Sequence, residues 1–319
     1  LEKILLGPLF ARFFGHYFMK QIVERTESVD SFRETLFAYY ELTKPGITFM
    51  VLSSMTVGFL LASSTGIDFV SLINAMLGTY LIAAGTAAHN QYMERNLDKL
   101  MIRTSKRPLP MARIPEFNAR IFSLSLIFAG LLYLIITVNF VAGLVSLGTS
   151  FVYLALYTPL KQVSVWNVPI GSVAGALPPV GGWAAATGTI TDPGMWILFA
   201  IVFFWQIPHV LSIAWLCNDD YTKAGFRMLP KNDINGRITG ILNLICLVAL
   251  IPTVYALYSL GYNGLLFLIP SLIATLWFIY MGWLFIKTPG KDSARKLMFA
   301  SIFYLPIVWI IVLIDNLFF

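Results

Sequence analysis

Three oxygen-bearing side chains recur at four-residue intervals in the stretch NQYMERNLDKLMIRTSKRPLP, at 90–110. They are Asn90, Glu94 and Asp98. On a helix, this spacing keeps the three side chains within an arc of about 80°, so they share one face. Mg²⁺ prefers carboxylate, amide and water oxygens, and it is commonly shared between one or two carboxylates and substrate phosphates. The spacing therefore predicts a face that holds a metal ion bound to a phosphate group.

Cationic side chains follow this face in the same stretch. They are Arg103, Lys106 and Arg107. Arginine bonds phosphate oxygens in a bidentate manner and lysine acts as a point charge. An isolated run of charges is more often a solvated helix end. Asn90, however, lies at the boundary of a long apolar segment, where polar side chains are unfavourable, and this position favours a site for a metal-bound polyphosphate.

A second polar loop, at 215–233, carries further oxygens beside a cation. Asp219 and Asp220 are adjacent, and Lys223 follows one helical turn after Asp219. An Asp pair at a helix end is most often a solvated cap. Together with the first loop, it would supply the two acidic clusters with which two metal ions clamp one diphosphate. The expected metal ligands are Asn90, Glu94, Asp98, Asp219 and Asp220.

The two polar loops interrupt a chain that is mostly apolar. Of its 319 residues, 58% are hydrophobic and 12% are charged, and the mean hydropathy is +0.76. This composition is typical of a polytopic membrane protein and not of two soluble domains. The formal net charge of +6 first indicates membrane orientation, because cytoplasmic loops collect Lys and Arg. We therefore expect a lipid bilayer around the protein and no nucleic-acid partner.

The 22 Lys and Arg residues fall into blocks, and the gaps between blocks limit how often the chain can cross a bilayer. One crossing needs about 20 residues, so four of the gaps hold a hairpin of two spans and the C-terminal stretch holds one. The spans should be helices, since they lack the period-two alternation of a barrel. They are expected at 46–64, 69–91, 121–138, 140–158, 168–187, 194–216, 238–260, 265–286 and 297–316.

The sequence therefore predicts an all-α, polytopic membrane protein with nine transmembrane helices. Residues 1–43 are expected to form an N-terminal cytoplasmic or interfacial segment, and residues 44–319 the membrane domain. By the positive-inside rule, the N-terminus and the basic loops face the cytoplasm of a bacterium or the matrix of a mitochondrion. We favour the bacterial plasma membrane, because residues 1–43 do not resemble a transit peptide.

Two of the expected spans carry features that suit a cavity. His209 follows Pro208, which removes a backbone hydrogen bond inside the sixth span. An intramembrane histidine is a functional candidate, although a histidine bonded to the freed carbonyl explains the pattern equally well. The fifth span is rich in Gly and Ala and contains the pair Pro178 and Pro179, so it favours either close helix packing or an opening. Trp205 is one of several aromatic residues that could line an isoprenoid slot, with plain lipid contact as the alternative.

Six stretches of the sequence, taken together, resemble the UbiA-type intramembrane prenyltransferases. They resemble most closely the heme branch of that superfamily, the protoheme IX farnesyltransferases or heme O synthases. The resemblance covers about residues 40–316. The NxxxExxxD spacing alone indicates only the superfamily, whereas the first, fourth and last of the matching stretches together are specific to the heme branch. The matching stretches are LTKPGIT at 42–48, NQYMERNLDKLMIRTSKRPLP at 90–110, YTPLKQ at 157–162, WNVPIGSVAGALPPVGGW at 166–183, WQIPHV at 205–210 and NDDYTKAGFRMLP at 218–230.

The resemblance implies nine helices around a central cavity, Mg²⁺ as cofactor, and farnesyl diphosphate and heme b as substrates. The farnesyl group would pass to a heme vinyl group with addition of water, giving heme O and diphosphate. The metal ligands and cations of the two loops would be the catalytic residues. Heme A synthase or oxidase-assembly proteins are the implied protein partners. The expected substrate-binding residues are Tyr157, Lys161, Trp205 and His209, the last as a ligand of the heme or a partner of its propionates.

Two departures from the superfamily pattern concern the metal ions. The middle ligand is Glu94 where Asp is usual, and Lys223 stands where a DxxxD spacing would place its last Asp, so one and two metal ions remain alternatives. Two other functions also remain open. A prenyltransferase with an aromatic acceptor, making a quinone precursor, is the alternative within the same fold. A membrane transporter of an anionic substrate is the alternative from another class.

Overall fold

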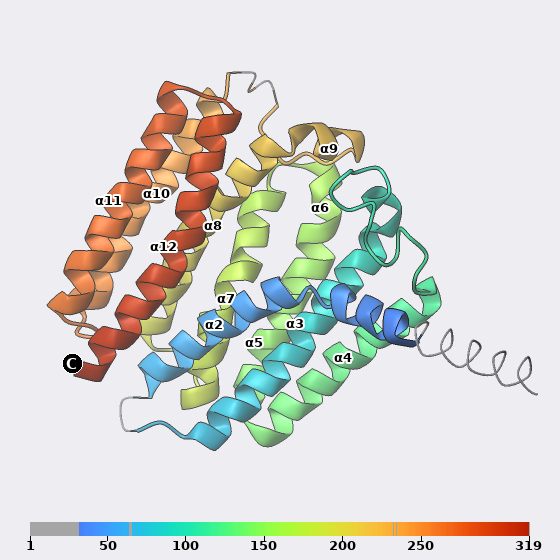
Figure 1. Cartoon of the computed structure of the whole chain (residues 1–319). Helices are drawn as coiled ribbons and strands as arrows, with labels where there is room; N and C mark the ends of the chain where they lie inside the picture. Colours follow the sequence, from blue (N-terminus) through green and yellow to red (C-terminus); the bar gives the residue numbers. More distant parts are fainter. Residues whose placement is uncertain (1–31, 64–65, 232, 234, 319) are drawn as a thin grey trace, which may run out of the picture.

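Long helices make up most of the computed structural model of the chain, which describes residues 32–63, 66–231, 233 and 235–318 (Figure 1). Within these ranges there is no β-strand, so the all-α prediction is confirmed. Nine helical segments of the described chain have the length of a membrane span. They are α2 (Pro45–Ala62), α3 (Phe69–Asp98), α4 (Glu116–Thr137), the segment Phe140–Val163, α7 (Asn167–Thr187), α8 (Pro193–Leu216), α10 (Arg237–Ser259), α11 (Leu265–Lys287) and α12 (Lys291–Phe318).

The observed segments follow the predicted spans closely. Eight of the nine in the described chain are apolar enough to cross a membrane, and the ninth, α7, has the length but is rich in Gly, Ala and Pro. Two helices extend well beyond their predicted ends: α3 continues to Asp98, and α12 begins at Lys291. The continuation of α3 places the whole 90–98 stretch on one helix. The protein is therefore a multi-pass, all-helical membrane protein.

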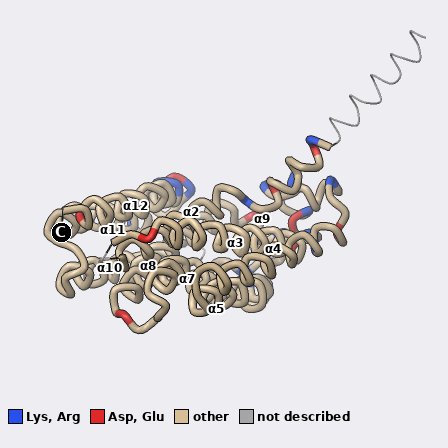
Figure 2. Tube along the Cα trace, turned by 90° about the horizontal axis from the view of Figure 1, so that it is seen from below, with Lys and Arg blue, Asp and Glu red and all other residues tan. Residues whose placement is uncertain are grey.

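Charge is segregated between the two ends of the helical bundle. The long segments alternate in direction, so consecutive loops lie at opposite ends (Figure 1). Four of the loops, at 63–68, 138–139, 188–192 and 260–264, contain no Lys or Arg. Figure 2 shows many of the charged residues beside α9 (Asn218–Lys223), while most of the helical tube is uncharged. The basic loops therefore lie together at one end of the bundle, as the gaps between blocks of Lys and Arg predict.

Glycines allow α2 and α7 to pack with their backbones in direct contact. A Cβ added at Gly182 would lie 1.8 Å from the main-chain oxygen of Met55, and one at Gly58 would lie 2.0 Å from that of Pro179. Neither position tolerates a side chain unless the helices move apart. The expectation that small residues of the fifth span serve close packing is thus realised at this interface.

The segment Phe140–Val163 is continuous but contains a π-helix. Its parts are α5 (Phe140–Phe151), η1 (Val152–Tyr157) and α6 (Thr158–Val163). The i→i+5 bonding of a π-helix is rare, occurs mostly as single turns inside α-helices and is frequent at functional sites. Here the wider turn carries Tyr153 and Tyr157, two residues that border the cavity described below.

Most of the predicted N-terminal segment, residues 1–31, lies outside the described residues. Residues 32–42 are helical, and Ala38 and Leu42 are fully buried in a cluster that includes Ala88 of α3. This end of the segment therefore packs on the membrane domain.

Candidate active site

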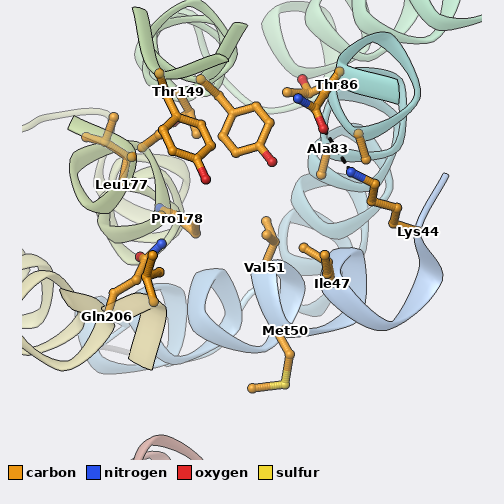
Figure 3. Close-up of a pocket in the computed structure, with 18 of the residues that line it drawn as sticks. Lys44, Ile47, Met50, Val51, Ala83, Thr86, Thr149, Leu177, Pro178 and Gln206 are labelled. Atoms are coloured by element: carbon orange, nitrogen blue, oxygen red, sulfur yellow. Dashed lines mark hydrogen bonds between the residues drawn. The ribbon is translucent and has the colours of Figure 1, made fainter. Parts of the chain in front are cut away.

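A cavity of about 600 Å³ opens among α2, α3, the Phe140–Val163 segment, α7, α8 and α12. Its volume lies within the range of ligand sites, about 300–1,000 Å³. In Figure 3, Ile47 and Val51 of α2, Thr86 of α3 and Leu177 of α7 surround one central space. The wall is apolar over most of its length, and the charged residues lie at the basic end. Such a cavity suits a molecule with an anionic head and a hydrocarbon tail.

The three oxygen ligands expected on α3 all border this cavity. Asn90, Glu94 and Asp98 are 1%, 5% and 0% exposed. Their common face follows from the four-residue spacing on the continuous α3 helix. Burial of two carboxylates requires compensating charge, because an unpaired buried charge is strongly unfavourable.

Cations from two other parts of the chain compensate the two carboxylates. Lys161 Nζ of α6 donates to Glu94 Oε1 at 2.6 Å. Arg107, in the loop after α3, donates from Nη1 to both oxygens of Asp98, at 2.9 and 2.8 Å. The structure therefore brings the expected residues Lys161 and Arg107 into the site. A negatively charged ligand would find these cations already in place.

Asn90 is held by Lys44, a residue that the spacing of motifs did not identify. Lys44 Nζ donates to Asn90 Oδ1 at 2.9 Å (Figure 3), and Asn90 Nδ2 donates to Thr158 Oγ1 at 3.1 Å. Burial and the nearby charge of Arg107 lower the pKa of Lys44 to about 7. Lys44 also has a left-handed backbone, with φ 49° and ψ 63°, which is uncommon for a residue with a side chain; such strained residues cluster at active sites.

The signal that could have found Lys44 lies in its local sequence. It is the last cation before the first span and it directly precedes Pro45, which disfavours the right-handed helical conformation at the preceding residue. It also lies within the stretch LTKPGIT, which contributed to the family resemblance. A lone lysine at a span boundary nevertheless has no spacing that connects it to α3.

The donor set on α3 fits a Mg²⁺ ion. It offers one amide and two carboxylate groups, all hard oxygen donors, and leaves further positions for water and phosphate. In the described chain, no group of three or more His, Cys, Asp and Glu side chains lies close enough to form a metal cage. Water and substrate phosphates would complete the coordination of such an ion.

The second polar loop does not deliver its acidic side chains to this face. Asp219 and Lys223 are exposed, and neither they nor Asp220 border the cavity. Asp220 instead accepts a hydrogen bond from the main-chain N–H of Arg103 at 3.2 Å. The expected clamp of two acidic clusters is thus not formed in the described structure, because α9 turns Tyr221 to the cavity in place of its carboxylates.

Of the remaining cations of the first loop, one lies at the rim of the cavity and the other lies outside it. Arg103 borders the cavity, and its Nη2 donates to Tyr221 Oη at 3.3 Å. Lys106 is exposed and lies outside the cavity wall. Burial raises the pKa of Tyr221, so its hydroxyl stays neutral beside these cations.

Aromatic residues form two parts of the wall. Lys161 Nζ lies 4.4 Å from the ring centroid of Tyr157, so both expected substrate-binding residues stand beside Glu94. Farther along, the rings of Trp205 and His209 stack at 5.2 Å with an angle of 15°. His209 Nδ1 lies 2.7 Å from a serine hydroxyl of α12, so the alternative in which His209 bonds a freed carbonyl is not observed.

Exposed residues of α2 and α12 border the cavity. Ile47 and Met50 of α2 and Ile302 of α12 line it, and all three have exposed side chains. All three are apolar, and they lie on helices that face lipid. A hydrocarbon chain can therefore pass from the bilayer into the cavity without crossing a polar surface.

Buried amide and carboxylate oxygens at the end of a largely apolar cavity suit an enzyme that acts within the membrane. The chain belongs to the UbiA prenyltransferase family, which matches residues 51–303. Within that family it is similar to proteins named protoheme IX farnesyltransferase. The relative from Solibacter usitatus is 40% identical over 287 residues, which cover 87% of this chain and 98% of the relative. The relative from Opitutus terrae is 38% identical over 281 residues, covering 88% and 95%.

Solved structures share the fold. A digeranylgeranylglyceryl phosphate synthase superposes with a TM-score of 0.76 at 20% identity, covering 90% of this chain and all of that one. A UbiA homologue from Archaeoglobus fulgidus, bound to GPP and Mg²⁺, gives 0.62 at 14% identity, covering 86% and 99%. The family resemblance drawn from the sequence motifs is confirmed, as is the prediction of a prenyltransferase.

Proposed function

We propose that the protein transfers the farnesyl group of farnesyl diphosphate to a vinyl group of heme b, with addition of water, giving heme O and diphosphate. One observation carries the proposal: a lipid-accessible cavity ends at three buried oxygen ligands, each paired with a cation. The choice of prenyl donor and acceptor follows the relatives named protoheme IX farnesyltransferase.

The diphosphate head binds at the α3 face. Mg²⁺ held there by Asn90, Glu94 and Asp98 would act as a Lewis acid that stabilises charge on the leaving diphosphate. The cations that contact these oxygens can turn to the phosphate oxygens, since Arg and Lys donate several hydrogen bonds each. They are Lys44, Lys161 and Arg107.

The reaction needs no nucleophilic side chain. The C1–O bond of farnesyl diphosphate breaks and diphosphate leaves with the electron pair. The π electrons of the heme vinyl group then form a bond to C1, and water captures the resulting cation and loses a proton. The protein contributes fixed positive charge where the leaving anion develops, and its apolar wall excludes water until the carbon–carbon bond has formed.

The two substrates bind to different parts of the cavity wall. The farnesyl tail enters between α2 and α12 and lies along the apolar side chains of α2 and α7. Heme b lies against α8, where His209 and Trp205 border the cavity. We place the protein in the bacterial inner membrane, with the basic loops in the cytoplasm, and we expect heme A synthase or oxidase-assembly proteins to receive the product.

A competition between acceptors tests the proposal. Purified protein receives farnesyl diphosphate, Mg²⁺, heme b and 4-hydroxybenzoate in one mixture, and mass spectrometry identifies the products. We expect the hydroxyethylfarnesyl derivative of heme together with released pyrophosphate. Prenylated benzoate without a heme product would favour the quinone-precursor alternative, and the absence of pyrophosphate release would favour the transporter.

A further inference from the structure

Ser301 of α12 is a fully buried residue that holds two aromatic side chains of α8. Its main-chain oxygen accepts a hydrogen bond from Trp205 Nε1 at 2.7 Å, and its Oγ lies 2.7 Å from His209 Nδ1. Both rings border the cavity, whereas Ser301 does not. A residue behind the cavity wall therefore sets the orientation of two rings on that wall.

The hydroxyl proton of Ser301 is already engaged. Ser301 Oγ lies 2.5 Å from the main-chain oxygen of Met298, and a carbonyl oxygen can only accept. The single hydroxyl proton therefore goes to Met298, and Ser301 Oγ accepts a hydrogen bond from His209. A neutral His209 then carries its ring proton on Nδ1, which leaves an electron pair on Nε2.

We propose that Ser301 is a positioning residue that presents Nε2 of His209 as an axial ligand for the iron of the heme acceptor. The inference rests on the proposed function, since it requires heme in the cavity. Histidines that ligate metals almost always donate their other ring N–H to an oxygen, which fixes both tautomer and ring orientation. Ser301 Oγ supplies that oxygen, and the stacked ring of Trp205 restrains rotation of the imidazole.

This ligand places the acceptor across the cavity from the diphosphate. Gln206 lies one helical turn before His209 on α8, and Figure 3 shows it on the opposite side of the central space from Thr86 of α3. Asn90 is one turn beyond Thr86 on α3. Heme held from α8 would therefore keep its iron away from the oxygen ligands of α3, while a vinyl group reaches the space between.

Titration of ferric heme b into the purified full-length protein, without farnesyl diphosphate, tests the proposal. The Soret band and the EPR spectrum report the axial ligand. The variants are His209→Ala, Ser301→Ala and Ser301→Thr, with Ser212→Ala as the matched control. Ser212 is also fully buried, and its Oγ donates to the main-chain oxygen of His209 at 2.8 Å, so its removal deletes a neighbouring hydroxyl without touching the ring.

The wild type and Ser212→Ala are expected to give the spectrum of histidine-ligated heme, and His209→Ala is expected to lose it. Ser301→Ala should weaken heme affinity about ten-fold, the lower end of the effect of removing a partner of a metal ligand. Ser301→Thr retains the hydroxyl and should restore the histidine spectrum. The KM for farnesyl diphosphate should be the same in Ser301→Ala and in the wild type.

An unchanged heme spectrum in His209→Ala would overturn the inference, as would a Ser301→Ala variant that binds heme no more weakly than Ser212→Ala. These results leave the proposed function intact if the same preparations still farnesylate heme. A wild-type protein that binds no heme at all would remove both the inference and the proposed acceptor.

Discussion

At the scale of single residues, the site depends on ion pairs between distant parts of the sequence. Glu94 and Asp98 are buried on α3 and pair with Lys161 and Arg107. Removing one member of a buried pair leaves an unpaired charge, which costs about 3–5 kcal/mol. The pairs therefore compensate the buried charges of the site, and the same cations are in position to bind an anionic substrate.

Replacement of Lys44 tests the contribution of a single cation. Lys44→Met removes the ammonium group that contacts Asn90. We expect kcat/KM for pyrophosphate release to fall about 100-fold, because this is the typical effect of removing one hydrogen-bond donor to an anion that forms in the transition state. The control is Lys99→Met, an exposed lysine that follows Asp98 directly. Equal rates in the two variants would show that Lys44 does not act on the substrate.

Replacement of single aspartates tests whether the protein binds one metal ion or two. Asp98→Asn removes a buried ligand charge, so we expect a loss of at least about 100-fold in turnover and a weaker response to Mg²⁺. Asp219→Asn changes an exposed side chain outside the cavity. We expect its turnover and its response to Mg²⁺ to stay close to those of the wild type. Turnover assays across a Mg²⁺ titration would measure this, and similar losses in both variants would restore the two-metal arrangement.

Spacing along one helix predicted the α3 residues, whereas Lys161 was expected only through the family resemblance. The α3 ligands share a face because of their periodicity, whatever surrounds them. Lys44 and Asp219 depend instead on how separate elements meet in space. No local pattern could reveal that Lys44 reaches Asn90 or that α9 turns Asp219 outward.

At the scale of elements, the helices were predictable from charge gaps, but their internal irregularities were not. The gaps located each span to within a few residues, apart from the longer ends of α3 and α12. The π-helix Val152–Tyr157 leaves no trace in apolar composition, because its residues are as apolar as those of an ordinary span. Its effect is to re-aim Tyr153 and Tyr157, which a continuous α-helix would turn to other positions.

The close approach of α2 and α7 leads to a prediction about stability. Gly182→Ala would place a methyl group against the main-chain oxygen of Met55, so we expect destabilisation of about 1–3 kcal/mol from overpacking. Gly181→Ala is the matched control, because its Cβ would meet Val145 at an ordinary 3.6 Å. Thermal unfolding in detergent compares the two, and equal Tm values would mean that the helices separate without cost.

At the scale of the whole molecule, function and topology are linked by the segregation of charge. The oxygen ligands, their cations and α9 lie at the basic end of the bundle, while the four loops of the other end lack Lys and Arg. If the basic end faces the cytoplasm, as proposed, a diphosphate substrate made there reaches its site without crossing the membrane, while its tail enters from lipid.

Cysteine labelling tests this orientation. In a background with Cys217→Ser and Cys246→Ser, single cysteines at Lys223 and Thr189 report the two ends of the bundle. With intact cells and a membrane-impermeant maleimide, we expect Thr189→Cys to react and Lys223→Cys to react only after lysis. The reverse pattern would place the site outside the cytoplasm and contradict the proposed orientation.

The mass spectrum of heme extracted from bacterial membranes tests the central claim most directly. Membranes containing the wild-type protein should yield heme b that carries an added hydroxyethylfarnesyl group, and membranes containing Asp98→Asn at the same level should yield heme b alone. An unmodified heme pool in the wild-type membranes, or equal amounts of the adduct with both proteins, would contradict a farnesyl transfer that depends on the oxygen ligands of α3.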